Sequence, residues 1–229
     1  MLPIYDVTPF TLLDFPGKTS CIVWFSGCNM RCGYCHNPDI VRGGKGHGTV
    51  GQALAFLQKR RGLLDGVVLS GGESTLYKDI VPFAEEIKRL GYAVKLDTNG
   101  TRPDVVREML QKKLLDYVAL DYKAPISKYK KVTATHLFNS FDETLMRLCR
   151  QDTVPFEVRT TVHHDLLDER AIADIMDDLS ARRYRGVYYV QNYINNDTPQ
   201  LGSLPPQKKT LDIGKLPQPR GFTLEFRNF

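Results

Sequence analysis

The residues with the clearest capacity for chemistry are three cysteines in one short stretch. Cys28, Cys32 and Cys35 have the spacing CxxxCxxC and directly follow an apolar, strand-like run, Ser20–Phe25. Three thiolates can hold three irons of a [4Fe–4S] cube and leave the fourth iron without a protein ligand, free to bind a substrate. The spacing therefore predicts a cluster-binding loop with one open iron.

Two other uses of these cysteines must be weighed. With His36 they would make a Cys3His zinc set, although structural zinc sites usually draw their ligands from two separated segments. A disulfide framework is disfavoured because five cysteines is an odd number and no secretory signal is visible. We expect the remaining two cysteines, Cys21 and Cys149, to be small buried residues.

Length and composition predict one globular domain. The chain has 229 residues, of which 42% are hydrophobic, enough for a sizeable core. No apolar run approaches the roughly 18 residues that a membrane span needs, and the N-terminus has no basic segment followed by an apolar one. The net charge of +5 is too small to indicate nucleic-acid binding. We therefore expect a cytoplasmic protein with neither a membrane nor a nucleic-acid partner.

Strand-like and helix-like segments alternate along most of the chain. The predicted strands are 20–25, 66–70, 93–97, 117–121, 156–162 and 186–191. The predicted helices are 50–61, 79–90, 104–113, 141–150 and 169–182. Thr49 with Gln52, and Ser140 with Glu143, are predicted to form capping boxes at two helix starts. Short βα units of this kind form parallel sheets with right-handed crossovers.

Six such units are fewer than the eight of a closed barrel. We therefore expect an α/β fold, an open partial (β/α)6 TIM-like barrel, over residues 1–191. Residues 192–229 contain five prolines and are expected to form a C-terminal extension packed on the same domain, with a short final strand at 223–226.

Polar residues stand where the predicted strands end. Parallel β/α folds place their chemistry in the loops at the carboxyl ends of the strands, so these residues are expected to converge with the cysteines on one rim. In strand order they are Gly71, Gly72 and Glu73, then Asp97 and Thr98, then Asp121 and Lys123, and finally Arg159.

These residues carry a resemblance to a known family. CxxxCxxC with an aromatic residue, Tyr34, before the third cysteine, followed by the Gly-Gly-Glu segment 71–73, resembles the radical S-adenosylmethionine (SAM) superfamily. More narrowly, DFPGK at 14–18, CHNP at 35–38, LDTNG at 96–100 and LDYK at 120–123 resemble the glycyl-radical-enzyme activases. Among these, the resemblance is greatest to the longer form of the activating protein of anaerobic ribonucleoside-triphosphate reductase.

The resemblance implies a [4Fe–4S] cluster that chelates SAM at its open iron and cleaves it reductively. The radical formed from SAM would then remove a hydrogen atom from a glycine Cα of a partner enzyme. No protein side chain is expected to act catalytically beyond the cluster and SAM.

The resemblance also implies roles for individual residues. Cys28, Cys32 and Cys35 would bind the cluster, and Asp14 would contact the glycine-bearing loop of the partner. Asp97, Thr98 and Asp121 would bind a monovalent cation beside the SAM carboxylate. The residues expected to bind the cofactor are Tyr34, His36, Gly71, Gly72, Glu73, Asp97, Thr98, Asp121, Lys123 and Arg159.

The implied partners are a glycyl radical enzyme, with anaerobic ribonucleotide reductase as the leading candidate, and an electron donor of flavodoxin or ferredoxin type. Two departures from the family pattern matter. Ser74 stands where proline is frequent, and 191–195 lacks the histidine expected of a pyruvate formate-lyase activase. The alternatives are a small-molecule radical SAM enzyme similar to 7-carboxy-7-deazaguanine synthase and a zinc-stabilised binding module without catalysis.

Overall fold

The strands of the molecule form one sheet. The computed structural model describes residues 2–44, 46–194, 200–202 and 204–229. Its strands are β1 (Ile4–Thr11), β2 (Ser20–Phe25), β3 (Gly66–Gly71), β4 (Ala93–Thr98), β5 (Tyr117–Asp121), β6 (Phe156–Val162), β7 (Val187–Asn192) and β8 (Thr223–Arg227). Its α-helices are α1 (Pro38–Val41), α2 (Val50–Lys59), α3 (Ile80–Arg89), α4 (Pro103–Gln111), α5 (Ile126–Thr133), α6 (Phe138–Arg150) and α7 (Glu169–Ala181). Two short 3-10 turns are η1 (Ser74–Leu76) and η2 (Ile213–Lys215).

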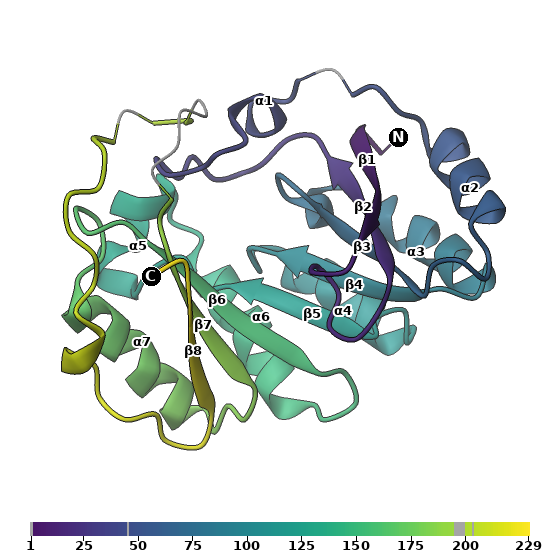
Figure 1. Cartoon of the computed structure of the whole chain (residues 1–229). Helices are drawn as coiled ribbons and strands as arrows, with labels where there is room; N and C mark the ends of the chain where they lie inside the picture. Colours follow the sequence, from purple (N-terminus) through teal and green to yellow (C-terminus); the bar gives the residue numbers. More distant parts are fainter. Residues whose placement is uncertain (1, 45, 195–199, 203) are drawn as a thin grey trace.

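The eight strands lie in chain order from β1 to β8. β1 is antiparallel to β2, and each later pair is parallel. β1 and β8 are the two edges, and they face one another across the opening of a curved sheet (Figure 1). The expected α/β open partial barrel is confirmed, with β2–β7 as its six predicted strands. β1 was not among the predicted strands, whereas the expected final strand is present as β8.

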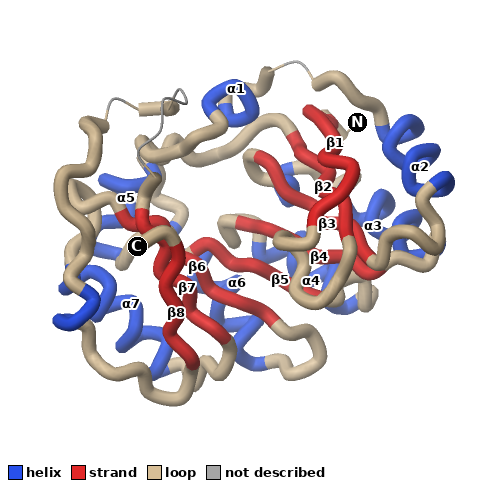
Figure 2. The backbone as a smooth tube through the Cα atoms, viewed as in Figure 1, coloured by secondary structure: helices blue, strands red, loops and turns tan. Residues whose placement is uncertain are grey.

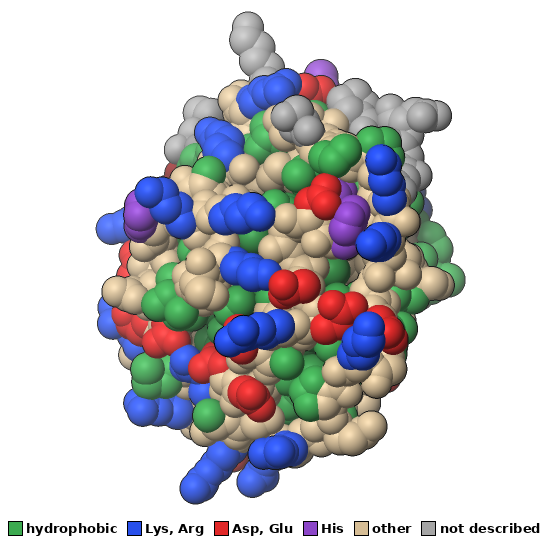
Figure 3. All heavy atoms as spheres, turned by 90° about the vertical axis from the view of Figure 1, so that its left-hand side faces the viewer, with side chains coloured by type: hydrophobic (Ala, Val, Ile, Leu, Met, Phe, Trp, Pro, Cys, Tyr) green, Lys and Arg blue, Asp and Glu red, His purple; other side chains and the backbone are tan. Residues whose placement is uncertain are grey.

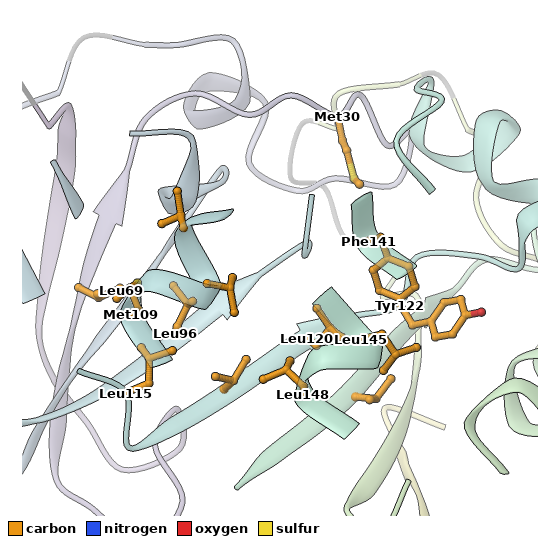
Figure 4. Close-up of a cluster of buried hydrophobic side chains, with 14 of the residues drawn as sticks. Met30, Leu69, Leu96, Met109, Leu115, Leu120, Tyr122, Phe141, Leu145 and Leu148 are labelled. Atoms are coloured by element: carbon orange, nitrogen blue, oxygen red, sulfur yellow. The ribbon is translucent and has the colours of Figure 1, made fainter. Parts of the chain in front are cut away.

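The main core lies between the outer face of the sheet and the helices around it (Figure 2). Strand residues alternate in direction, so that on β4 Val94 and Leu96 face this core while Lys95 and Asp97 face the inside of the barrel. Figure 4 shows part of the core, with Leu69 and Leu96 beside Met109 of α4, and Leu120 beside Leu145 and Leu148 of α6. Burial of each such leucine stabilises the fold by about 1.5–3 kcal/mol.

A second, smaller apolar cluster closes the lower end of the barrel interior. Phe15, from the turn between β1 and β2, packs against Ile22 and Val68. This position places the apolar cluster near the amino ends of the parallel strands. The charged residues of the inner face therefore lie nearer the opposite rim, where β3, β4 and β5 end.

One predicted helix start is confirmed and one is wrong. The capping box of Thr49–Gln52 is formed at the start of α2. The capping box expected at Ser140 is not, because α6 already begins at Phe138. The ring of Phe138 packs against the rings of Tyr122 and Tyr129, and this aromatic packing outweighs the local capping signal.

The surface carries charges of both signs. On the face drawn in Figure 3, Lys and Arg side chains are interspersed with Asp and Glu. Among the described residues, no helix is both long enough and apolar enough to cross a membrane.

Candidate functional site

The loop that carries the three cysteines leaves β2 and leads to α1 at the top of the barrel opening (Figure 1). It is anchored on both sides. The Gly27 N–H donates to the carbonyl oxygen of Ile40 in α1 at 2.6 Å, and the Arg31 N–H donates to that of Thr133, the last residue of α5, at 2.9 Å. The Arg31 guanidinium also donates to the Cys28 carbonyl oxygen at 2.6 Å. These hydrogen bonds define the path of the loop.

All three cysteines line one cavity. The opposite side of the cavity is formed by the ends of β3, β4 and β5, which is the convergence expected of a parallel β/α fold. Sequence-predicted residues among its lining are Cys28, Cys32, Cys35, Tyr34, Gly71, Gly72, Asp121 and Lys123. A larger hollow near Cys149 and Tyr184 lies at the amino ends of β6 and β7, away from this rim.

The donor set fits an iron–sulfur cluster better than a Cys3His zinc site. His36 faces away from the cysteine cavity: its ring stacks on that of Tyr193, with the ring centroids 5.0 Å apart, and it lines a different pocket. The three thiols therefore share the cavity without the imidazole. Three sulfur ligands beside free space match a cluster with one open iron.

Burial disfavours the thiolate form of two of the three cysteines. Burial raises the pKa of Cys28 to about 11, and burial also raises the pKa of Cys32, with Lys123 opposing the rise at both. Without metal these two thiols keep their protons at neutral pH. Cluster assembly must displace the protons, since thiolate is the ligand form, and the positive charge of Lys123 favours that step.

Gly71 and Gly72 bring the end of β3 against the start of the cysteine loop. Gly71 has φ of +127°, and a Cβ there would collide with the Phe25 backbone. A Cβ at Gly72 would collide with the carbonyl oxygen of Gly27. The Glu73 N–H donates to that same oxygen at 2.9 Å. The glycines were expected to bind the cofactor, and the structure adds a second reason for them, the close approach of two backbone segments.

Glu73 holds loops together. Its buried carboxylate accepts hydrogen bonds from the Asn99 N–H at 2.6 Å and the Thr98 hydroxyl at 2.9 Å, and from both the N–H and the hydroxyl of Thr75. Burial raises the pKa of Glu73, and these four donors oppose the rise. Glu73 thus joins the loop after β3 to the loop after β4. The Thr98 hydroxyl is hydrogen-bonded to Glu73, and Thr98 does not line the cysteine cavity.

Asp121 lies at the centre of an ion-pair network at the end of β5. Its Oδ1 accepts from Arg159 Nε at 2.9 Å and its Oδ2 from Lys123 Nζ at 3.0 Å. Burial opposes ionisation of Asp121, but Arg159 and Lys123 outweigh it and lower its pKa to about 2. Arg159 also lies 3.5 Å from Asp97 Oδ2. The predicted residues Asp97, Asp121, Lys123 and Arg159 are therefore one connected group.

Asp14 is not part of this group. It lies in the turn between β1 and β2, near the amino end of β2, whereas the cysteines follow the carboxyl end of that strand. Six strand residues span about 20 Å. Asp14 Oδ2 accepts from the Thr11 hydroxyl at 2.5 Å. Leu13 beside it is 93% exposed, so this turn presents an apolar residue to solvent.

The C-terminal extension contacts the cysteine loop directly. The Leu201 N–H donates to the Cys35 carbonyl oxygen at 3.0 Å, and the Gly202 N–H donates to that of Gly33 at 3.1 Å. The chain later joins the sheet as β8, parallel to β7. The extension therefore helps to hold the loop between the second and third cysteines. The residues 195–199 and 203, which were included in the predicted extension, lie outside the described part of the chain.

Several residues at the site were not predicted from the sequence. Met30, Asn37, Val41 and Asn99 also line the cysteine cavity. Lys95 was missed as well, although strand alternation could have found it, since it is two residues before Asp97 and so faces the same way. Its Nζ lies 2.6 Å from Asp97 Oδ1.

The pattern of the radical SAM superfamily matches residues 22–191, and this chain belongs to that superfamily, whose members are enzymes that use a [4Fe–4S] cluster and SAM. The chain is 37% identical over 180 residues to the protein named "Putative glycyl-radical enzyme activating enzyme MJ1227" of Methanocaldococcus jannaschii, with 75% of this chain and 73% of that protein covered. The pyruvate formate-lyase-activating enzyme of Clostridium pasteurianum is 35% identical over 127 residues, 52% of each chain. The 7-carboxy-7-deazaguanine synthase of Methanopyrus kandleri is 30% identical over 132 residues, 48% of this chain and 52% of that one.

Solved structures share the fold. Streptococcus suis SuiB superimposes with a TM-score of 0.65 at 12% identity, covering 89% of this chain and 47% of that chain. The structure titled "Native anSMEcpe with bound AdoMet" gives a TM-score of 0.60 at 18% identity, covering 74% and 50%. At such identities the likeness concerns the fold alone.

Proposed function

We propose that this chain is a radical SAM activase that installs a glycyl radical on a partner enzyme. Cys28, Cys32 and Cys35 would hold a [4Fe–4S] cluster in the cavity described above. When bound, the cluster supplies one electron that divides SAM into methionine and a 5′-deoxyadenosyl radical, and this radical takes a hydrogen atom from the target glycine Cα. We infer the SAM chemistry from one observation, that the three thiols line the same cavity as Asp121 and Lys123.

The residues of this chain would orient SAM and exclude water. Lys123 Nζ is the cation on the cavity wall, and we assign it to the SAM carboxylate. Asp121 fixes Lys123 by the 3.0 Å ion pair and keeps its own negative charge because its pKa is about 2. Tyr34, 5% exposed, would form an apolar wall close to the cluster. Such a charged yet sheltered site suits electron transfer to a sulfonium, because exclusion of water strengthens the electrostatic interactions that orient SAM.

The activase assignment is supported by relatives of this chain whose names describe activating enzymes. Within that group we propose anaerobic ribonucleotide reductase as the partner, on the resemblance of the DFPGK and CHNP segments and the absence of histidine from 191–195. We further propose that a flavodoxin or ferredoxin supplies the electron and that the protein works in the cytoplasm. The exposed turn at Leu13 and Asp14 is the proposed contact for the glycine-bearing loop.

The experiment mixes the anaerobically reconstituted protein, a reductant and SAM with candidate glycyl radical enzymes. We expect a glycyl-radical EPR doublet on anaerobic ribonucleotide reductase and an equal amount of 5′-deoxyadenosine. Cys35→Ser is the matched inactive control, because it removes one cluster ligand from the same loop. A doublet on pyruvate formate-lyase alone would support the activase assignment but exclude the proposed partner.

A second candidate follows from the match to a 7-carboxy-7-deazaguanine synthase. An enzyme of that kind acts on a small molecule and needs no protein substrate. SAM-dependent conversion of a small molecule, and no doublet on any candidate protein, would favour it over the activase.

A further inference from the structure

The place expected to hold a monovalent cation is already filled by side chains of the protein. A cation between Asp97, Thr98 and Asp121 would need oxygen atoms free to coordinate it. The Asp97 oxygens accept from Lys95 and from Ser70 Oγ, the latter at 3.3 Å. Both Asp121 oxygens accept from cationic side chains, as described above. Thr98 Oγ1 donates to Glu73 and accepts from the Gly100 N–H at 3.0 Å. These residues therefore do not fit the expected cation.

Lys95 is the main reason why these residues do not fit the expected cation. It projects from β4 on the same face as Asp97, and only 3% of its side chain is exposed. Lysine is almost never fully buried unless it is paired. Its sheet neighbours are Val68 on β3 and Tyr117 on β5, and neither supplies a negative charge at neutral pH. The ammonium group is thus committed to Asp97, 2.6 Å away.

Within the ion-pair group around Asp97 and Asp121, the charges balance only if Lys95 is included. Three carboxylates lie close together, those of Asp97, Asp121 and Glu157, the last with its oxygen 3.9 Å from Arg159 Nη1. Three cations face them, Lys95, Lys123 and Arg159. Loss of Lys95 would leave the group one positive charge short. A bound monovalent ion would supply the same single charge.

We propose that the Lys95 ammonium takes the place of a monovalent cation beside Asp97, so that SAM binding in this chain is independent of K⁺ and Na⁺. Lys95 is then a positioning residue: it holds Asp97, and through Arg159 it holds Asp121 and the lysine assigned to the SAM carboxylate. The inference rests on the proposed function for the presence of SAM in the cavity. It does not depend on which partner protein is activated.

The experiment compares cluster-loaded wild-type protein with Lys95→Met under argon. Each protein is placed in potassium, sodium or tetramethylammonium chloride at equal ionic strength of about 0.1 M, so that screening stays constant. The thermal midpoint is measured without and with SAM, and SAM affinity is measured by equilibrium dialysis. Tetramethylammonium is the reference because it is too large for a carboxylate-lined site of this kind. Lys88→Met, which breaks a half-exposed pair with Asp116 on the outside of the barrel, is the matched control.

For wild type we expect the same midpoint and the same SAM affinity in all three salts. For Lys95→Met we expect SAM affinity to fall about tenfold in tetramethylammonium and to recover in potassium or sodium, as one unpaired buried carboxylate would require. Its midpoint should rise by roughly 2–4 °C with a saturable dependence on the small cation. Lys88→Met should show no such specificity.

A saturable potassium or sodium effect on wild-type protein would overturn the proposal, and so would a folded Lys95→Met variant that ignores the small cations. If Lys95→Met does not fold, Lys95→Gln replaces it. The wild-type salt series still shows whether SAM binding depends on potassium or sodium. The midpoint measured without SAM separates this proposal from the function: a chain that binds no SAM would refute the proposed function, while the salt response would still test Lys95.

Discussion

Replacement of Asp121 by Asn should remove a contribution to stability whose size follows from its ion pairs. The Asp121 pKa falls from its ordinary value of 3.8 to about 2, because Arg159 and Lys123 overcome the opposing effect of burial. At about 1.36 kcal/mol for each pKa unit, this difference corresponds to about 2 kcal/mol. The side chain is 24% exposed, so solvent screens the pairs only in part. We therefore expect Asp121→Asn to lower the free energy of unfolding by about 2 kcal/mol at pH 7.

The dependence on pH has a definite direction. The folded-state pKa lies below the unfolded one, so this stabilisation is fully present above about pH 4 and is lost as pH falls from about 4 toward 2. The gap in unfolding free energy between wild type and Asp121→Asn should therefore stay constant from pH 7 to about pH 5. Below about pH 4 it should narrow.

Urea unfolding under argon, followed by far-UV circular dichroism, measures both quantities. Glu85→Gln is the control, because the Glu85–Lys112 pair is 45% exposed on each side and should contribute less than about 1 kcal/mol. An Asp121→Asn protein within about 0.5 kcal/mol of wild type at pH 7 would refute the reasoning. A gap that stays constant to about pH 3 would show that the difference does not come from the charge of Asp121.

Three further changes test other parts of the molecule. Cys32→Ala should abolish cluster retention and SAM cleavage, whereas Cys149→Ala should leave both intact. Iron and sulfide analysis and a 5′-deoxyadenosine assay measure the two properties, and a Cys32→Ala protein that keeps both would contradict the thiol assignment. Gly72→Ala should lower the free energy of unfolding by more than about 1 kcal/mol, because its Cβ would collide with backbone, and an unchanged urea midpoint would contradict that collision. Leu13→Asp should leave SAM cleavage unchanged but slow radical transfer to the partner about tenfold, with Ile213→Asp as the surface control, and equal EPR yields from both variants would exclude the turn as a contact.

The sequence predicted the sheet well where strand signals were clear. β2, β5 and β6 have the predicted bounds, because β2 and β5 are mostly apolar runs and β6 alternates polar with β-branched or aromatic residues, each between polar turns. β1 was missed because Ile4–Thr11 is mostly half-exposed and contains a proline. Its strand character depends on pairing with β2, which local patterning does not reveal.

The sequence predicted which residues belong to the site better than it predicted the contacts between them. Motif spacing placed Cys28, Gly72 and Asp121 around one cavity, because parallel strands bring their carboxyl ends together. It could not show that His36 would stack on Tyr193, since that contact joins the cysteine loop to a segment beyond β7. Nor could it show that Lys95 would satisfy Asp97, because the choice between a protein ammonium and a dissolved cation depends on side-chain reach in three dimensions.

The inner face of the barrel is charged where an apolar face would give equal or greater stability. Buried ion pairs lose much of their Coulomb energy to desolvation, and well-packed hydrophobic residues in their place are often neutral or stabilising. The outer faces of the same strands show that this chain can pack apolar residues, since Val94, Leu96 and Leu120 are completely buried there. The Asp121–Lys123 ion pair, which lies on the wall of the cysteine cavity, is therefore better explained by a ligand than by the fold. A zwitterionic, sulfonium-bearing molecule such as SAM, which presents a carboxylate, an amino group and a positive sulfur within a short span, suits a wall on which acidic and basic groups alternate at hydrogen-bonding distance.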